Sequence, residues 1–190
     1  MFFLDKPRTP AHFQQYHQAL SNANIVKLLD QVTKLETQTA MVGGGQVNPT
    51  IRRSKILFIP TEGDMNWIYQ ATASYLREMN QRHFGFDLTA IESIQYTEYH
   101  GSEQGNYNDH VDWRCNPHII RKLSMSIQLS DDNEYVGGNL EIKASSKPFI
   151  ASRIKGDACV FPSFLLHGVT PVTSGIRRSL VVWALGPEFR

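Results

Sequence analysis

The chain has 190 residues and a formal net charge of +1 at pH 7, with 41% hydrophobic and 19% charged residues. This length and composition are typical of one globular domain, so the sequence predicts a single domain over residues 1–190. The near-zero charge argues against binding to nucleic acid or an anionic membrane, and the lack of a long apolar run or a basic leader favours a cytoplasmic protein.

The first 85 residues space their apolar side chains as helices do and are expected to form a helical support region. Helix starts are marked by Ser and Asp, whose side chains can accept hydrogen bonds from the free N–H groups of a first turn. The expected elements, in chain order, are a polar strand over 12–20, a helix over 22–35 capped by Ser21, a short strand over 56–59 and a helix over 65–80 capped by Asp64.

Between these helices, residues 40–55 contain three consecutive glycines, followed by Arg52 and Arg53. The glycines lack the GxxxxGK pattern, which excludes a phosphate-binding loop of that type. A mobile loop is the favoured interpretation. The two arginines are either solvated or, because they adjoin this loop, in contact with a substrate.

From residue 86 onward the pattern changes to short strands separated by turns, which is typical of a sandwich or barrel. Helices followed by strands favour a double-sheeted jelly roll with the helices outside. The expected fold is therefore α+β and mainly β: a double-stranded β-helix of cupin-like type over 86–190, with helices from 1–85 packed on its major sheet. The expected strands cover 91–99, 107–113, 121–130, 139–143, 148–153, 158–162, 168–173 and 177–185.

The segment 121–130 shows the clearest alternation between apolar and small polar side chains. Its two faces carry Leu123, Met125, Ile127 and Leu129 on one side, and Ser124, Ser126 and Gln128 on the other. Small hydroxyls with one amide suit a polar ligand cavity, and they suit an ordinary outer face about equally well. Both interpretations stay open on the pattern alone.

Two residues in a short polar segment, His110 and Asp112, point to a metal site. On a β-strand residues i and i+2 share a face, so the imidazole and the carboxylate would lie side by side, and Asp109 would point away. A second imidazole from His167 would complete three ligands on one side of a metal. Two histidines and one carboxylate with open positions opposite form the facial triad of non-heme Fe(II) oxygenases.

The chain contains two cysteines, Cys115 and Cys159, and neither belongs to a CxxC pair. Zinc-finger and redox-motif interpretations are therefore weak. Reduced thiols in an intracellular protein are favoured, while a disulfide between the two stays open.

Taken together, these motifs resemble the Fe(II)/2-oxoglutarate-dependent oxygenase superfamily, and within it the prolyl 4-hydroxylase-like and PKHD-type hydroxylases of small bacterial or phage type. The resemblance covers roughly residues 86–186. Its specificity lies in the order and spacing of the HxD pair, the later histidine and a basic residue ten positions on. The matching pieces are Tyr99, His110-Val111-Asp112, Arg121-Lys122-Leu123-Ser124, Val136-Gly137-Gly138-Asn139-Leu140, Gly156-Asp157, Phe161-Pro162-Ser163, His167, and Pro171-Val172-Thr173-Ser174-Gly175 leading to Arg177 and Trp183.

The resemblance implies that His110, Asp112 and His167 bind Fe(II) and take part in catalysis. It also implies that Arg177 binds the distal carboxylate of 2-oxoglutarate, because a guanidinium fork can meet a carboxylate with two hydrogen bonds. Arg178 is the neighbouring candidate, but the family places its arginine six residues before the tryptophan, which is Trp183 here.

Further co-substrate contacts follow from the same resemblance. Tyr99 resembles a tyrosine that contacts 2-oxoglutarate in related hydroxylases, and Ser124, Ser126 and Gln128 would line the pocket. Many relatives have a tyrosine on this strand where the present chain has Gln128.

The implied activity is a dioxygenase that consumes O2 and 2-oxoglutarate, releases succinate and CO2 and hydroxylates an unactivated C–H bond, with ascorbate as a reductant. A peptidyl proline is the first expected substrate. A free amino acid or another small metabolite is the second, and the pose of the 40–55 loop would distinguish a peptide groove from a closed pocket. A non-catalytic metal-binding jelly roll is the third alternative. The sequence does not indicate the oligomeric state.

Overall fold

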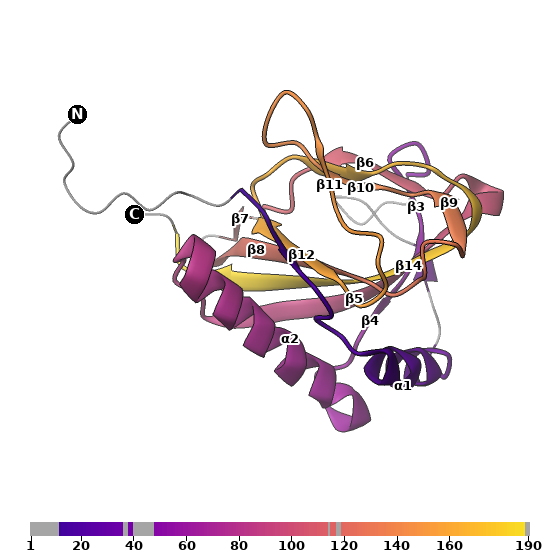
Figure 1. The fold of residues 1–190 in the computed structure, drawn as a ribbon. Helices are drawn as coiled ribbons and strands as arrows, with labels where there is room; N and C mark the ends of the chain where they lie inside the picture. The colour runs from indigo at the N-terminus through magenta and orange to yellow at the C-terminus, as the bar shows by residue number, and fades with distance from the viewer. Residues whose placement is uncertain (1–11, 36–37, 40–47, 114, 117–118, 189–190) are drawn as a thin grey trace.

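The computed structural model describes residues 12–35, 38–39, 48–113, 115–116 and 119–188. Two β-sheets face each other, and two helices, α1 (Asn22–Val32) and α2 (Asn66–Met79), lie against the outer side of the larger sheet (Figure 1). The expected fold, a mainly β jelly roll with helices on its major sheet, is confirmed. Residues 40–47 of the expected mobile loop lie outside the described residues. No helix in the described ranges is long and apolar enough to cross a membrane.

The larger sheet contains most of the long strands, and the last of them in the sequence, β14, occupies the centre. Its hydrogen-bonded order is β1 (Gln14–Tyr16), β12 (Ala158–Pro162), β8 (Ile119–Gln128), β14 (Val172–Gly186), β5 (Ala90–His100), β4 (Lys55–Phe58) and β2 (Gln38–Thr39), with β7 (Cys115–Asn116) beside β8 and β9 (Tyr135–Gly137) beside β14. The smaller sheet has the order β11 (Phe149–Ile150), β10 (Leu140–Ile142), β13 (His167–Val169), β6 (Asn106–His110) and β3 (Arg52–Arg53).

The starts of the two helices differ from each other. Ser21 caps α1 as expected, because its side chain accepts a hydrogen bond from the backbone N–H of Asn24 at 3.3 Å. The expected cap at Asp64 is wrong. A one-turn 3-10 helix at Gly63–Met65 precedes α2, so Asp64 already lies inside a turn and makes no capping hydrogen bond. The π-helical turn Asn80–Phe84 then extends α2 at its other end.

Several strand boundaries also differ from expectation. The strand expected over 107–113 ends at His110, and the strand expected over 12–20 shrinks to β1. The two strands expected over 168–173 and 177–185 are instead the short β13 and the long β14. β14 runs through Gly175 at φ +72°, where a side chain would collide with the carbonyl oxygen of Glu134, so the glycine lets the strand continue past a close neighbour.

The alternation over 121–130 separates two environments. One face of β8 joins the apolar core that includes side chains from α1, α2, β5, β12 and β14. The other face, with Ser124 and Gln128 buried, lies between the two sheets. The structure therefore favours an interior position between the sheets over an outer face for these polar residues. Cys159 also faces this interior as a free buried thiol, and burial raises its pKa to about 12.

Candidate active site

Three potential metal ligands meet between the two sheets. His110 ends β6 and His167 begins β13, and these two residues are direct cross-strand partners. Asp112 lies beyond the end of β6, where its backbone N–H donates to the carbonyl oxygen of Ser163 at 2.9 Å. The expectation that His110 and Asp112 share one regular strand is therefore wrong, because this contact with a distant segment places the carboxylate. The candidate ligand atoms of the three side chains all lie within 4.8 Å of one another.

Hydrogen bonds at the far side of each imidazole orient its ring. The Nδ1 atom of His110 lies 2.8 Å from the carbonyl oxygen of Asn108, and that of His167 lies 2.9 Å from the carbonyl oxygen of Leu165. A carbonyl accepts only from a protonated nitrogen, so each imidazole, once neutral, has its lone pair on Nε2, the atom that faces Asp112. Those Nε2 atoms lie 3.7 Å and 3.4 Å from the carboxylate oxygens. Two nitrogens and one carboxylate aimed at one point fit a divalent transition metal.

The pKa values of His110 and Asp112 are both shifted toward the protonation states that bind a metal cation. Burial, together with the positive charge of His167, lowers the pKa of His110 to about 4, so its imidazole is neutral near pH 7. Burial of Asp112 opposes ionisation, yet hydrogen bonding and charge from His167 outweigh it and hold the pKa of this carboxyl well below its usual range. A neutral imidazole and an ionised carboxylate are the forms that bind metals.

Ser124 contacts the triad directly. Its Oγ donates to Asp112 Oδ2 at 2.7 Å and lies 2.9 Å from the Oγ of Ser163. The sequence placed Ser124 among the co-substrate contacts, and the structure places it behind the carboxylate, where it fixes the orientation of Asp112. The part played by Ser163 was missed, since its only local signal is its position after Phe161-Pro162.

A second polar cluster lies on the face of the larger sheet that is turned toward the smaller sheet. Arg177 is 4% exposed, and its guanidinium lies 5.5 Å from the centre of the Tyr99 ring. In the part of the chain that the structure describes, it forms no ion pair, and its hydrogen-bond partner is the neutral hydroxyl of Ser179 at 3.4 Å. A buried guanidinium without a carboxylate is costly unless an anion completes it.

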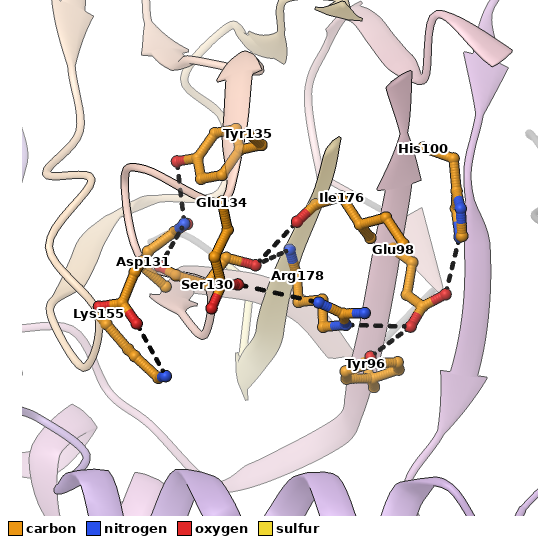
Figure 2. A network of polar contacts seen from close by, with 11 residues as sticks. Tyr96, Glu98, His100, Ser130, Asp131, Glu134, Tyr135, Lys155, Ile176 and Arg178 are labelled. Atoms are coloured by element: carbon orange, nitrogen blue, oxygen red, sulfur yellow. Dashed lines mark hydrogen bonds and ion pairs between the residues drawn. The ribbon is translucent and has the colours of Figure 1, made fainter. Parts of the chain in front are cut away.

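Arg178 lies on the opposite face of β14. Its Nε atom is 3.4 Å from Glu98 Oε1, and Figure 2 shows that this carboxylate also contacts Tyr96 and His100. The alternation along β14 thus turns Arg177 inward and Arg178 outward, which agrees with the choice of Arg177 over Arg178 from the spacing to Trp183.

Gln128 is buried on the same interior face as Arg177, and Ser126 on that face is partly exposed. The amide nitrogen of Gln128 donates to the carbonyl oxygen of Ser130 at 3.1 Å and to the hydroxyl of Tyr135 at 2.9 Å. Tyr135 was not among the expected site residues. Its neighbours Val136-Gly137-Gly138 were part of the motif, but nothing in the local pattern gave the direction of its side chain.

The two arginines after the glycine-rich segment lie in different environments. Arg53 is exposed, whereas Arg52 is buried and donates to Gln95 Oε1 at 2.8 Å. The guanidinium of Arg52 covers the ring of Tyr107, which stacks on His110 with ring centroids 3.6 Å apart. The solvated interpretation is therefore wrong for Arg52, which lies beside the triad.

Comparisons with known proteins find similar sequences and structures. The family model of the 2OG-Fe(II) oxygenase superfamily matches residues 94–185. A PKHD-type hydroxylase of Synechococcus sp. (strain CC9311) is 38% identical over 81 residues, which are 43% of this chain and 37% of that protein. The PKHD-type hydroxylase YbiX of Escherichia coli O157:H7 is 26% identical over 174 residues, 86% of this chain and 73% of that protein. The chain thus spans about a third to a half of the first curated relatives that it matches.

Solved structures share the fold. A prolyl hydroxylase from Trichoplax adhaerens, determined with a peptide fragment of hypoxia inducible factor, superposes with a TM-score of 0.78 at 19% identity, covering 91% of this chain and 83% of that one. A prolyl-4-hydroxylase from Pseudomonas putida gives 0.73 at 22% identity, covering 91% and 92%.

Proposed function

Because the family model of the 2OG-Fe(II) oxygenase superfamily matches residues 94–185, we propose that the chain is an Fe(II)- and 2-oxoglutarate-dependent dioxygenase that hydroxylates an unactivated C–H bond. Succinate and CO2 are the expected co-products, O2 is the second co-substrate, and ascorbate is the proposed reductant. The observation that carries the proposal is that the converging triad lies between the two sheets, and that Arg177, which forms no ion pair within the described residues, is buried on the side of β14 that faces the same interior.

In this proposal His110, Asp112 and His167 hold the metal through two Nε2 atoms and one carboxylate. The metal and its co-substrate supply the oxidising chemistry when bound. Ser124 keeps Asp112 oriented, and the two backbone carbonyls at the Nδ1 atoms keep the imidazoles oriented. Arg177 binds the distal carboxylate of 2-oxoglutarate, whose charge neutralises the buried guanidinium.

The proposed substrate is a peptidyl proline. The two segments that carry the triad also carry exposed apolar side chains, and the Asp112–Ser163 hydrogen bond holds these segments together. Exposed apolar side chains gathered beside a site support a polypeptide partner over a small polar metabolite. These side chains are Val111, Trp113, Phe164 and Leu166.

The decisive test is anaerobic calorimetry of 2-oxoglutarate binding with Mn(II) in place of Fe(II). We expect metal-dependent binding by the wild type and its loss in Asp112→Ala and His110→Ala. Asp109→Ala is the matched control, because this neighbouring carboxylate is exposed, pairs with Lys143 at 2.5 Å and is not one of the three converging ligands. Full binding in Asp112→Ala would refute the metal assignment.

A folded wild type that binds no 2-oxoglutarate would favour the non-catalytic jelly-roll module. If binding is present, proline-containing peptides and free amino acids are incubated with Fe(II), 2-oxoglutarate and O2. A mass gain of one oxygen in a peptide would support the proposed substrate class, and a gain only in a free amino acid would support the metabolite alternative.

A further inference from the structure

The polar cluster around Arg177 contains a hydroxyl that the sequence motifs did not identify. Building on the proposed function, we infer that the Tyr135 hydroxyl binds the distal carboxylate of 2-oxoglutarate together with Arg177, and that Gln128 orients this hydroxyl. The inference assigns the ligand contact to β9, outside the strand on which many relatives carry a tyrosine.

The first step is the hydrogen-bond capacity of Gln128. Its amide nitrogen has two hydrogens, and it donates to the Ser130 carbonyl oxygen at 3.1 Å and to the Tyr135 hydroxyl at 2.9 Å. No amide hydrogen is left for a carboxylate. The phenol oxygen, which accepts one of these bonds, keeps its own hydrogen for donation. The hydrogen that can be donated to a bound carboxylate therefore belongs to the Tyr135 hydroxyl and not to the Gln128 amide.

The second step is the rigidity of Tyr135. Tyr135 is the cross-strand partner of Gly175 in β14, and the Tyr135 side chain is buried. The guanidinium of Arg153 lies 4.2 Å from the centre of its ring and also donates to the carbonyl oxygens of Gly137 and Tyr135. A phenol held in this way loses little freedom on binding a ligand, so its hydrogen bond contributes more to affinity.

The third step is the position of Tyr135 relative to Arg177. Both side chains border Gly138, at which a Cβ atom would lie 3.0 Å from Arg177 Cδ and 3.4 Å from Tyr135 Cδ2. On the other side, Ser179 contacts Arg177 and is the cross-strand partner of Gln128. The guanidinium and the phenol therefore belong to one cluster, and a carboxylate bound to Arg177 lies beside a donor hydroxyl.

The test uses Tyr135→Phe, with Tyr96→Phe as the matched control. Both changes remove one hydroxyl from a buried tyrosine, but Tyr96 lies on the outer face, where its hydroxyl donates to Glu98 at 2.6 Å (Figure 2). Two ligands are titrated anaerobically with Mn(II): 2-oxoglutarate, and 2-oxopentanoate, which has a methyl group in place of the distal carboxylate.

We expect Tyr135→Phe to weaken 2-oxoglutarate binding about tenfold or more, as for a lost hydrogen bond to a charged group, and to leave 2-oxopentanoate binding unchanged. Tyr96→Phe should leave the ratio of the two affinities unchanged. Unaltered 2-oxoglutarate affinity in Tyr135→Phe, or equal weakening of both ligands, would overturn the inference.

Gln128→Met provides a second variant, because it removes the orienting amide and keeps the phenol. We expect a smaller loss than in Tyr135→Phe that is again confined to 2-oxoglutarate, and a loss shared by both ligands would contradict the positioning role. The two proposals fail differently. If the wild type binds no 2-oxoglutarate, the proposed function fails, whereas wild-type binding with an unaffected Tyr135→Phe rejects this inference alone.

Discussion

The two faces of the major sheet are built from neighbouring residues of the same strands, but one face is apolar and the other carries buried polar side chains. The face under α1 and α2 is apolar and includes Leu123 and Leu180 in the core. The face toward the smaller sheet carries Ser124, Arg177 and Gln128, all buried. Since successive side chains alternate between faces, moving one position along a strand passes from a residue in the apolar core to a polar residue that faces the smaller sheet.

The comparison has an energetic side. Burial of apolar side chains under the helices contributes free energy of folding, at roughly 25 cal/mol per Å² of apolar surface. Burial of an unpaired guanidinium such as Arg177 costs free energy until an anion arrives. Burial on the apolar face therefore offsets the cost of the buried guanidinium, and substitutions on the two faces should separate effects on stability from effects on ligand binding.

The largest expected effect is on the interior face of β14. Arg177→Ala should weaken Mn(II)-dependent 2-oxoglutarate binding by about 2–5 kcal/mol, as for loss of one partner of a buried charge pair. Arg178→Ala should have little effect, because Arg178 is partly exposed and pairs with Glu98 on the outer face. Calorimetry of both variants checks the register of β14. A larger loss of 2-oxoglutarate affinity in Arg178→Ala than in Arg177→Ala would show that the register of β14 is shifted by one residue.

On the apolar face, Leu123→Ala should lower the free energy of unfolding by about 2–5 kcal/mol, because Leu123 is fully buried in the core. Below its melting temperature the variant should still bind Mn(II) and 2-oxoglutarate. Ser126→Ala, on the same strand but facing the interior, should change stability by less than about 1 kcal/mol. Urea titration measures both, and similar losses in the two variants would contradict the division between faces.

The smallest expected effect concerns Ser124, whose hydroxyl holds Asp112 at 2.7 Å. Ser124→Ala should weaken Mn(II) binding by roughly 10–100-fold, since a partner behind a metal ligand typically contributes that much. Its unfolding free energy should change less than that of Leu123→Ala. Metal titration followed by electron paramagnetic resonance measures the affinity, and wild-type affinity would show that Asp112 is oriented by its backbone alone.

Much of this arrangement follows from local sequence pattern. Alternation over 121–130 separates the two faces of β8. The spacing of ten residues from His167 to Arg177 is also read directly from the sequence. The position of Asp112 could not be obtained this way, since a hydrogen bond to Ser163 in a distant segment fixes it. The role of Tyr135 depends likewise on the pairing of β9 with β14.

Two further differences have the same origin. Arg52 has a local sequence typical of a solvated loop, yet pairing of β3 with β6 carries it inward to Gln95. Asp64 is a good capping residue by type, but the extra turn at Gly63–Met65 moves the start of α2 past it. The conformational preference of the local sequence is overridden wherever a contact between residues distant in sequence determines the backbone conformation.

The position of β14 has a consequence for biosynthesis. This strand lies between β8 and β5 in the larger sheet, yet the ribosome makes it after both. Until residues 172–186 emerge, the nascent chain carries two long strands with open hydrogen-bonding edges, which are surfaces that chaperones cover and that aggregate when left bare. A premature stop before residue 172 would therefore release a chain that lacks both its central strand and Arg177.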